Sequence, residues 1–207
     1  MTALYHITHI RNLALILQHG CLWCDNERVA QELGSVGIAH AHIKERRARR
    51  RVPLPPGGTL ADYVPFYFAP RSPMLYAIHR GNVEGYDGSQ ASVLHLVTSA
   101  ESVAESGLAY TFTNGHAEMM ISDFYADLSH LDQIDWEIMR AIIWRDTNED
   151  GDRKRRRQAE FLVHQCFPWP MITEIGVISS RVAEDVNSIL DGHEHRPMVV
   201  VHRDWYY

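Results

Sequence analysis

The chain of 207 residues is 45% hydrophobic and 22% charged, a composition typical of one globular domain with its own core. We therefore expect residues 1–207 to form a single domain. No segment approaches the roughly 20 apolar residues that cross a bilayer, and no basic stretch precedes the apolar N-terminus, so neither a membrane contact nor a signal peptide is expected. The three cysteines favour a reduced, cytoplasmic protein.

The net charge of −6 argues against a polyanionic partner, but the distribution of the basic residues argues for one. Of the twenty Lys and Arg residues, six lie in KERRARRR (44–51) and five in RKRRR (153–157). Two basic runs on an otherwise acidic chain favour nucleic acid as a partner. The alternative is that the runs are the solvated face of a helix and a solvated loop. If they serve one function, we expect them to converge on one cleft.

Short apolar runs predict strands, and spaced apolar residues behind capping signals predict helices. The predicted strands are, in chain order, 3–8, 64–69, 92–97, 108–113, 159–164, 173–178 and 198–202. The predicted helices are 8–19, 39–51, one beginning at 73, 98–107, 134–143 and 180–190. Segments 52–58 and 147–158 contain Gly, Pro or dense charge and are expected to be loops. The order predicts a mixed α+β fold rather than repeated βαβ units.

Three helix starts carry specific capping signals. Thr8 is expected to cap the first helix, and Ser72 followed by Pro73 is expected to begin the helix after the second strand. Thr98 and Glu101 have the spacing of a capping box.

Several common sites are missing from the sequence. It has no Walker A motif, no GxGxxG after a strand and no GxSxG, which disfavours P-loop proteins, Rossmann dinucleotide folds and α/β-hydrolases. CLWC at 21–24 is a lone CxxC without a second pair, and no HExxH is present. We therefore expect buried thiols and no metal site.

Two charged residues stand at informative places. Glu160 is at the first step of an apolar strand directly after a charged loop, where acids are rarely found without cause. A glutamate pointing from an edge strand into solvent is an equal alternative on these grounds. Arg51 ends the predicted basic helix at the rim of whatever the next loop covers, but taken alone it is better explained as one more solvated arginine.

Three segments resemble the ADP-ribosyltransferases. YHIT at 5–8, followed by N-L-x-x-I-L-x-x-G at 12–20, resembles their first strand and helix. YFA at 67–69 with the Ser and Tyr that follow resembles the middle segment of the poly(ADP-ribose) polymerase branch, and Glu160 completes a His–Tyr–Glu order. The block YVPFYFAPRSPMLYAI (63–78) and the rest of the chain look like the DarT family, whose members ADP-ribosylate thymine bases in single-stranded DNA.

The resemblance implies an ADP-ribosyltransferase fold of class α+β, with two facing, mostly antiparallel sheets around an NAD cleft and flanking helices. It implies NAD as a substrate, N3 of thymine in single-stranded DNA as the acceptor, and no metal. It also implies a toxin whose partner is a macrodomain antitoxin that removes ADP-ribose. The alternatives are an NAD-dependent ADP-ribosyl- or phosphotransferase acting on RNA or protein, and a non-enzymatic nucleic-acid-binding module.

The resemblance also implies roles for residues. Glu160 would stabilise the ribosyl cation that forms when nicotinamide leaves, and Arg51 would favour the deprotonated form of thymine N3. The residues expected to contact NAD are His6, Thr8, Tyr67, Arg71, Ser72 and Tyr76. The residues expected to contact DNA are Lys44, Arg47, Arg50, Trp144, Arg153, Lys154 and Arg155, with Trp144 stacking on an unpaired base.

Overall fold

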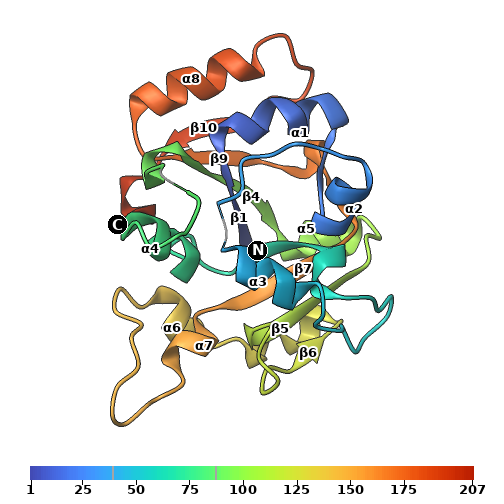
Figure 1. Ribbon diagram of the computed structural model, residues 1–207, viewed down its shortest axis with the longest axis vertical. Helices are drawn as coiled ribbons and strands as arrows, with labels where there is room; N and C mark the ends of the chain where they lie inside the picture. Colours follow the sequence, from blue (N-terminus) through green and yellow to red (C-terminus); the bar gives the residue numbers. More distant parts are fainter. Residues whose placement is uncertain (39, 87) are drawn as a thin grey trace.

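The structure is a computed structural model that describes residues 1–38, 40–86 and 88–207. Its centre is an eight-stranded sheet in the order β10-β9-β4-β1-β3-β7-β5-β6 (Figure 1). The strands are β1 Ala3–His9, β3 Tyr63–Tyr67, β4 Val93–Ser99, β5 Tyr110–His116, β6 Phe124–Tyr125, β7 Ala159–His164, β9 Glu174–Val177 and β10 Met198–Val201. All neighbours pair antiparallel except β9 and β10.

A small second sheet and short helices surround the large one. The second sheet pairs β2, Cys21–Trp23, with β8, Cys166–Pro168. The helices are α1 Leu13–His19, α2 Asp25–Ala30, α3 Ala41–Arg47, α4 Pro73–His79, α5 Ala100–Glu105, α6 Trp136–Arg140, α7 Arg153–Arg156 and α8 Ser180–Leu190. Figure 1 shows α8 beside the β9–β10 end and α6 and α7 near the β5–β6 end. Within the described residues, no helix has the length and apolarity needed to cross a membrane. This mixed content confirms the predicted α+β class.

The sheet is nearly interrupted in its middle. β1 pairs with β4 along seven residues, but it meets β3 at the single register pair Tyr5–Tyr67. The strands β10-β9-β4-β1 and β3-β7-β5-β6 therefore form two mostly antiparallel halves joined at one register pair. Where two facing sheets were predicted, the structure has this one large sheet with a narrow junction and the small β2–β8 sheet, and the cavity described below lies at the junction.

The core is built from large apolar side chains on both halves. Leu4 and Leu96 in the first half and Phe66, Phe112 and Phe161 in the second are fully buried. Burying such side chains contributes about 1.5–3 kcal/mol each. The rings of Phe112 and Phe161 stack with parallel planes, so β5 and β7 are held rigidly beside each other.

Two of the three predicted helix starts differ from the structure. β1 extends through Thr8 to His9, whose Nδ1 accepts from Arg11 N–H and caps a 3-10 turn before α1. Thr8 instead accepts a hydrogen bond from the Asn12 side chain. The Ser72 cap is confirmed, since its hydroxyl accepts from Leu75 N–H at the start of α4.

The predicted capping box before α5 is wrong by one residue. β4 continues through Ser99, which pairs with Ala3, and the Ser99 side chain caps α5 by accepting from Ser102 N–H. The Glu101 carboxylate accepts from Thr2 N–H instead. Pairing with β1 thus decides where β4 ends.

Three predicted segments extend beyond the elements that the structure shows. The helix predicted at 39–51 is limited to α3, which ends at Arg47, and residue 39 lies outside the described residues. The helix predicted at 134–143 is the shorter α6, and the loop predicted at 147–158 contains α7. The short elements β2, β8 and α2 had no sequence prediction, because three to six residues carry too little periodicity.

Candidate active site

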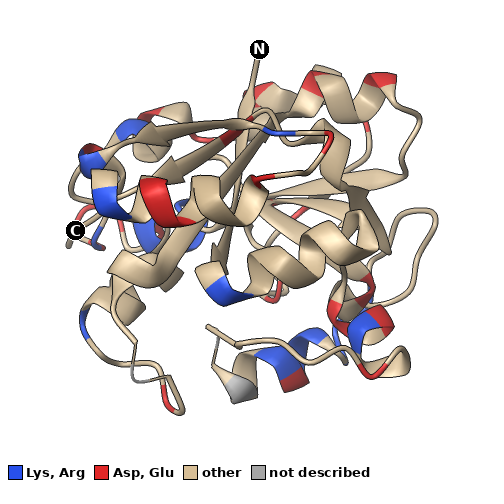
Figure 2. Cartoon of the chain, turned by 90° about the horizontal axis from the view of Figure 1, so that it is seen from above, with Lys and Arg blue, Asp and Glu red and all other residues tan. Residues whose placement is uncertain are grey.

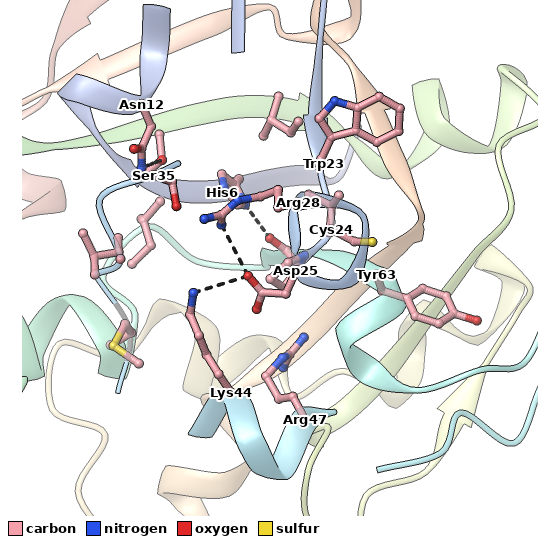
Figure 3. A pocket seen from close by; sticks show the side chains of 18 of the residues that line it. His6, Asn12, Trp23, Cys24, Asp25, Arg28, Ser35, Lys44, Arg47 and Tyr63 are labelled. Carbon is pink, nitrogen blue, oxygen red and sulfur yellow. Dashed lines mark hydrogen bonds and ion pairs between the residues drawn. The ribbon is translucent and has the colours of Figure 1, made fainter. Parts of the chain in front are cut away.

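A cavity of about 330 Å³ opens at the junction of the two halves of the sheet. Its walls come from β1, β3, α2, α3, α4 and the segment 33–38, and Glu160 on β7 lies in its lining. Figure 3 shows His6 from β1, Arg28 from α2, and Lys44 and Arg47 from α3 reaching into this space. Its volume lies within the range of cavities that hold small molecules, about 300–1,000 Å³.

Glu160 is buried, and both of its carboxylate oxygens have partners. It is 4% exposed and faces Tyr67 across β3 and β7. Oε2 accepts from Arg47 Nη1 at 2.6 Å, and Oε1 accepts from Ala117 N–H at 3.2 Å. The alternative of a glutamate pointing into solvent is therefore wrong. A carboxylate held this way is ready to face a developing positive charge.

Arg47 comes from the last turn of α3 and is buried against Glu160. Its side chain is 11% exposed. Burial disfavours its charge, but the Glu160 carboxylate outweighs this, so the pKa of Arg47 is raised. The Nη2 atom is buried with no hydrogen-bond partner among the described residues. A buried N–H of this kind is costly unless a ligand uses it.

His6 presents a fixed acceptor to the cavity. Its Nδ1 donates to the Pro65 carbonyl at 2.8 Å across the junction between β1 and β3. Burial lowers the pKa of His6, although the Pro65 carbonyl opposes this shift. The ring is therefore neutral at pH 7, and Nε2 is an acceptor able to take a hydroxyl proton.

A cationic pair lies on another wall, held by one aspartate. Asp25 Oδ1 accepts from Arg28 and from Lys44, both at 3.3 Å (Figure 3). Two cations share one carboxylate there, so the wall carries net positive charge. That charge suits an anionic group of a ligand.

Asn12 holds the segment 33–38, which forms part of the cavity wall. Its amide donates to the Val36 carbonyl at 3.0 Å, and its carbonyl oxygen accepts from Val36 N–H at 2.8 Å. Leu33, Val36 and Ile38 from this segment line the cavity. Asn12, directly before α1, thus fixes a segment of the cavity wall 24 residues away in the chain.

The structure brings three of the predicted NAD contacts into the cavity, namely His6, Thr8 and Tyr67. Arg71, Ser72 and Tyr76 are not in its lining. Ser72 uses its hydroxyl as the α4 cap, and the Arg71 guanidinium stacks on the Tyr207 ring at 4.3 Å. Met74 and Ala77 of α4 line the cavity instead, because residues three apart share a helix face.

Tyr76 and Trp144 belong to an aromatic group near the C-terminus. Their ring centroids are 5.7 Å apart, and Trp144 Nε1 donates to the Tyr207 hydroxyl at 3.2 Å. Tyr76 is 40% exposed. The role of Trp144 as a stacking platform for a base stays a prediction.

The first basic run divides between the cavity and the rim. Lys44 and Arg47 line the cavity, although both were predicted to contact DNA. Arg50 packs on the β5–β6 segment, over the Phe124 ring and against Met120. Arg51 lies beyond the helix, exposed, with its backbone bridged to Thr59, and it is not in the cavity lining. Because α3 ends at Arg47, that residue reaches Glu160 and Arg51 does not.

The second basic run is largely tied to aspartates. Arg155 makes two hydrogen bonds to Asp152, Arg156 bonds Asp135 and Asp150, and Lys154 pairs with Asp146 at 3.5 Å. Arg153 donates to the Ile143 carbonyl and lies 4.0 Å from Asp150. Arg157 is buried and donates to the carbonyls of Arg71, Ile138 and Met139. Figure 2 shows basic and acidic residues interspersed rather than separated.

The two runs contact a common segment, although only the first run reaches the cavity, so their expected convergence on one cleft stays a prediction. Arg50 donates to the Ala117 carbonyl at 3.4 Å, and Arg155 donates to Asn114 and Ser122 at 3.2 Å each. Both therefore contact the segment 114–122, which also bonds Glu160 through Ala117.

The polar cavity residues Asp25, Arg28, His116 and Gln158 are among those for which no role was predicted from the sequence. Asp25 and Arg28 lie on a helix too short to predict, and His116 was one of thirteen histidines without a distinguishing neighbour. Within the described residues, no group of three or more His, Cys, Asp or Glu is placed to hold a metal ion. Cys21 and Cys24 are buried free thiols.

Comparison with known proteins shows the family of the chain. Residues 5–207 match the family model described as "ssDNA thymidine ADP-ribosyltransferase, DarT". The chain belongs to the DarT family. A DNA ADP-ribosyl transferase of Thermus sp. (strain 2.9) is 49% identical over 208 residues, covering 100% of this chain and 96% of that protein. Solved structures of Thermus sp. 2.9 DarT with ADP-ribosylated ssDNA and with NAD+ superpose with TM-scores of 0.93 and 0.90, at 48% and 45% identity. Both superpositions cover 100% of this chain, and they cover 96% of the chain solved with ADP-ribosylated ssDNA and 98% of the chain solved with NAD+.

A more distant relative joins a DarT chain to a second activity. It is a DNA ADP-ribosyl transferase-DNA ADP-ribosyl glycohydrolase fusion protein of Thermosipho africanus, 27% identical over 190 residues. The match covers 91% of this chain and 45% of the fusion. The predicted family and ADP-ribosyltransferase fold are thereby confirmed.

Proposed function

We propose that this protein transfers ADP-ribose from NAD to N3 of thymine in single-stranded DNA. The observation that carries the proposal is the buried Glu160–Arg47 pair at the cavity between the two halves of the sheet, in a chain of the DarT family. NAD supplies two phosphates, two riboses and an amide. The cationic wall and the neutral His6 suit the phosphates and a ribose hydroxyl, respectively.

Glu160 acts at the ribose carbon C1′, which exchanges its bond to nicotinamide for a bond to the acceptor. The bond from C1′ to the nicotinamide nitrogen breaks, its electron pair leaves with neutral nicotinamide, and the sugar becomes cation-like. The carboxylate stabilises this charge and accepts a hydrogen bond from a ribose hydroxyl. Because the site is buried, the interaction is stronger than it would be in water.

The acceptor nitrogen must lose a proton as its new bond to C1′ forms. A guanidinium beside the base favours the anionic form of N3 by charge and hydrogen bonding. The geometry of Arg47 supports its assignment as this guanidinium. Its Nη1 donates to Glu160, and its Nη2 has no partner among the described residues and could donate to the base. Glu160 receives the proton. For Arg51 the same role remains a prediction from the resemblance.

We also propose a partner and a place of action. The fusion relative carries both a transferase and a DNA ADP-ribosyl glycohydrolase, which supports a toxin whose modification is removed by a macrodomain antitoxin. Free cysteines at 21, 24 and 166 and the use of NAD favour the cytoplasm.

The test is a mass measurement on oligonucleotides. Single strands with and without thymine, and an RNA control, are incubated with NAD and the protein. We expect the mass of one ADP-ribose on the thymine-containing DNA alone, and at least about a 100-fold lower rate for Glu160→Gln. Modification of RNA or protein in preference to DNA would contradict the proposed acceptor, and NAD binding without transfer would contradict the proposed reaction.

A further inference from the structure

The end of β5 bulges beside Glu160. Phe112 faces Phe161, and the next register pair is His116 with Ala159. Three residues of β5 therefore oppose the single residue Glu160 of β7. A bulge of this kind turns the strand and redirects the side chains that follow.

Arg155 holds the bulge in place. Asp152 fixes its guanidinium with two hydrogen bonds of 2.7 Å, and Arg155 Nη1 donates to Asn114 and to Ser122. The Ser122 hydroxyl in turn donates to the His116 carbonyl at 2.8 Å. One residue of the second basic run thus fixes the backbone that carries His116.

The bulge presents a hydrogen-bond donor to the cavity. His116 is half-buried in the cavity lining, and its Nδ1 accepts from Glu118 N–H at 3.2 Å. A neutral ring that accepts at Nδ1 carries its proton on Nε2. Among the described residues nothing accepts from this N–H. Ala117, the next residue, donates to Glu160, so the donor is close in sequence and space to the carboxylate.

The position of His116 favours the acceptor rather than NAD. After it the chain forms a turn that is exposed at Met119–Ile121. Arg46 pairs with Glu118 just before these residues, and Arg50 contacts Met120. A polymeric anion approaching from solvent meets this basic rim first. His116 lines the cavity, and it connects this turn to Ala117, whose N–H bonds Glu160, so a base that reaches Glu160 from this side meets His116.

We propose that His116 Nε2–H donates to a carbonyl oxygen next to N3 of the acceptor thymine during transfer, an inference that rests on the proposed function. When N3 bonds to C1′ and its proton passes to Glu160, negative charge builds on the flanking carbonyl oxygens. A fixed donor there stabilises the transition state more than the neutral base.

The test compares two conservative variants in two reactions. His116→Asn retains an acceptor for Glu118 N–H but has no donor at the position of Nε2, whereas His116→Gln retains a donor amide. We expect His116→Asn to lower kcat/KM for transfer to thymine DNA by about 100-fold and His116→Gln by less than about tenfold. Hydrolysis of NAD without DNA should stay within about twofold of wild type in both.

His193→Asn serves as the matched control, because His193 is exposed in the turn between α8 and β10. Equal transfer by His116→Asn and wild type would overturn the inference, and so would a parallel loss of NAD hydrolysis, which would indicate a structural or NAD-binding role. A wild-type protein that hydrolyses NAD but does not modify thymine DNA would overturn the proposed function and the inference with it.

Discussion

The guanidinium that faces Glu160 is the most informative single residue of the site. Arg47 and Arg51 are four residues apart, so they would share a face if the helix continued. It ends at Arg47 instead, and Arg51 is exposed beside Thr59. Identical side chains in one basic run therefore have different environments, and only Arg47 is desolvated against a carboxylate.

The first prediction separates these two arginines. We expect Arg47→Gln to lower kcat for transfer by about 100-fold or more, because it removes the charge beside Glu160. We expect Arg51→Gln to raise KM for DNA and to change kcat by less than about tenfold. Steady-state kinetics with a thymine oligonucleotide measures both. The reverse pattern would return the base-activating role to Arg51.

His95 on β4 makes the stability of the protein depend on pH. The ring is fully buried, with Nε2 donating to the Pro70 carbonyl. Burial lowers its pKa to about 4, outweighing the Pro70 contact. Since an unfolded histidine binds a proton near pH 6.5 and the folded one near 4, stability is complete at neutral pH and falls as the pH drops through that interval.

The second prediction measures this loss. Between pH 6.5 and pH 4, wild type should lose about 3 kcal/mol more free energy of unfolding than His95→Gln, which does not titrate there. Urea denaturation at several pH values provides the measurement. Acidic groups contribute to the pH dependence of both proteins, so the difference isolates His95. Parallel curves for the two proteins would show that His95 does not titrate in this range.

At the scale of elements, the sequence predicted correctly those helices, strands and caps that are determined by residues close together in the chain. The strand at 159–164 and the helix at 180–190 match the structure, and the Ser72 cap is formed by its own neighbours. The end of β4 is set by a partner strand some ninety-six residues away in the chain, Ala3 opposite Ser99. The bulge in β5 depends on Arg155, so neither feature could be read from its own segment.

The third prediction concerns that bulge. A Cβ on Gly115 would overlap the Arg155 guanidinium, which Asp152 holds in place. Gly115→Ala should therefore displace the bulge and lower transfer by about tenfold or more, since small misplacements of catalytic groups are costly. Gly34→Ala is the control, because no atom lies within 4 Å of its Cβ position. Equal kinetics in both variants would show that the clamp does not affect the site.

At the scale of the whole molecule, the two basic runs differ in how far their charges are paired. Glu160 and both runs were identified in the sequence, and one residue of each run contacts the segment 114–122, but only the first run lines the cavity. What the sequence could not show is that the second run is neutralised by Asp135, Asp146, Asp150 and Asp152. These acids are up to 21 residues away in the chain, so the sequence does not show that they pair with the basic run. The second run therefore braces the fold, while the end of the first remains free for a polyanion.

This division predicts how DNA binding depends on salt. Arg49 and Arg51 are exposed and have no ion pair among the described residues, whereas Lys154, also exposed, pairs with Asp146. Each phosphate contact adds about 0.7 to the slope of log K against log salt for single strands. We expect Arg49→Ala and Arg51→Ala each to make the slope shallower by about this amount, because each removes a free cation, and Lys154→Ala to leave it nearly unchanged. Fluorescence anisotropy of a labelled thymine oligonucleotide over a sodium chloride series measures the slopes. A larger effect from Lys154→Ala than from the two arginines would place the DNA path on α7 instead of the segment after α3.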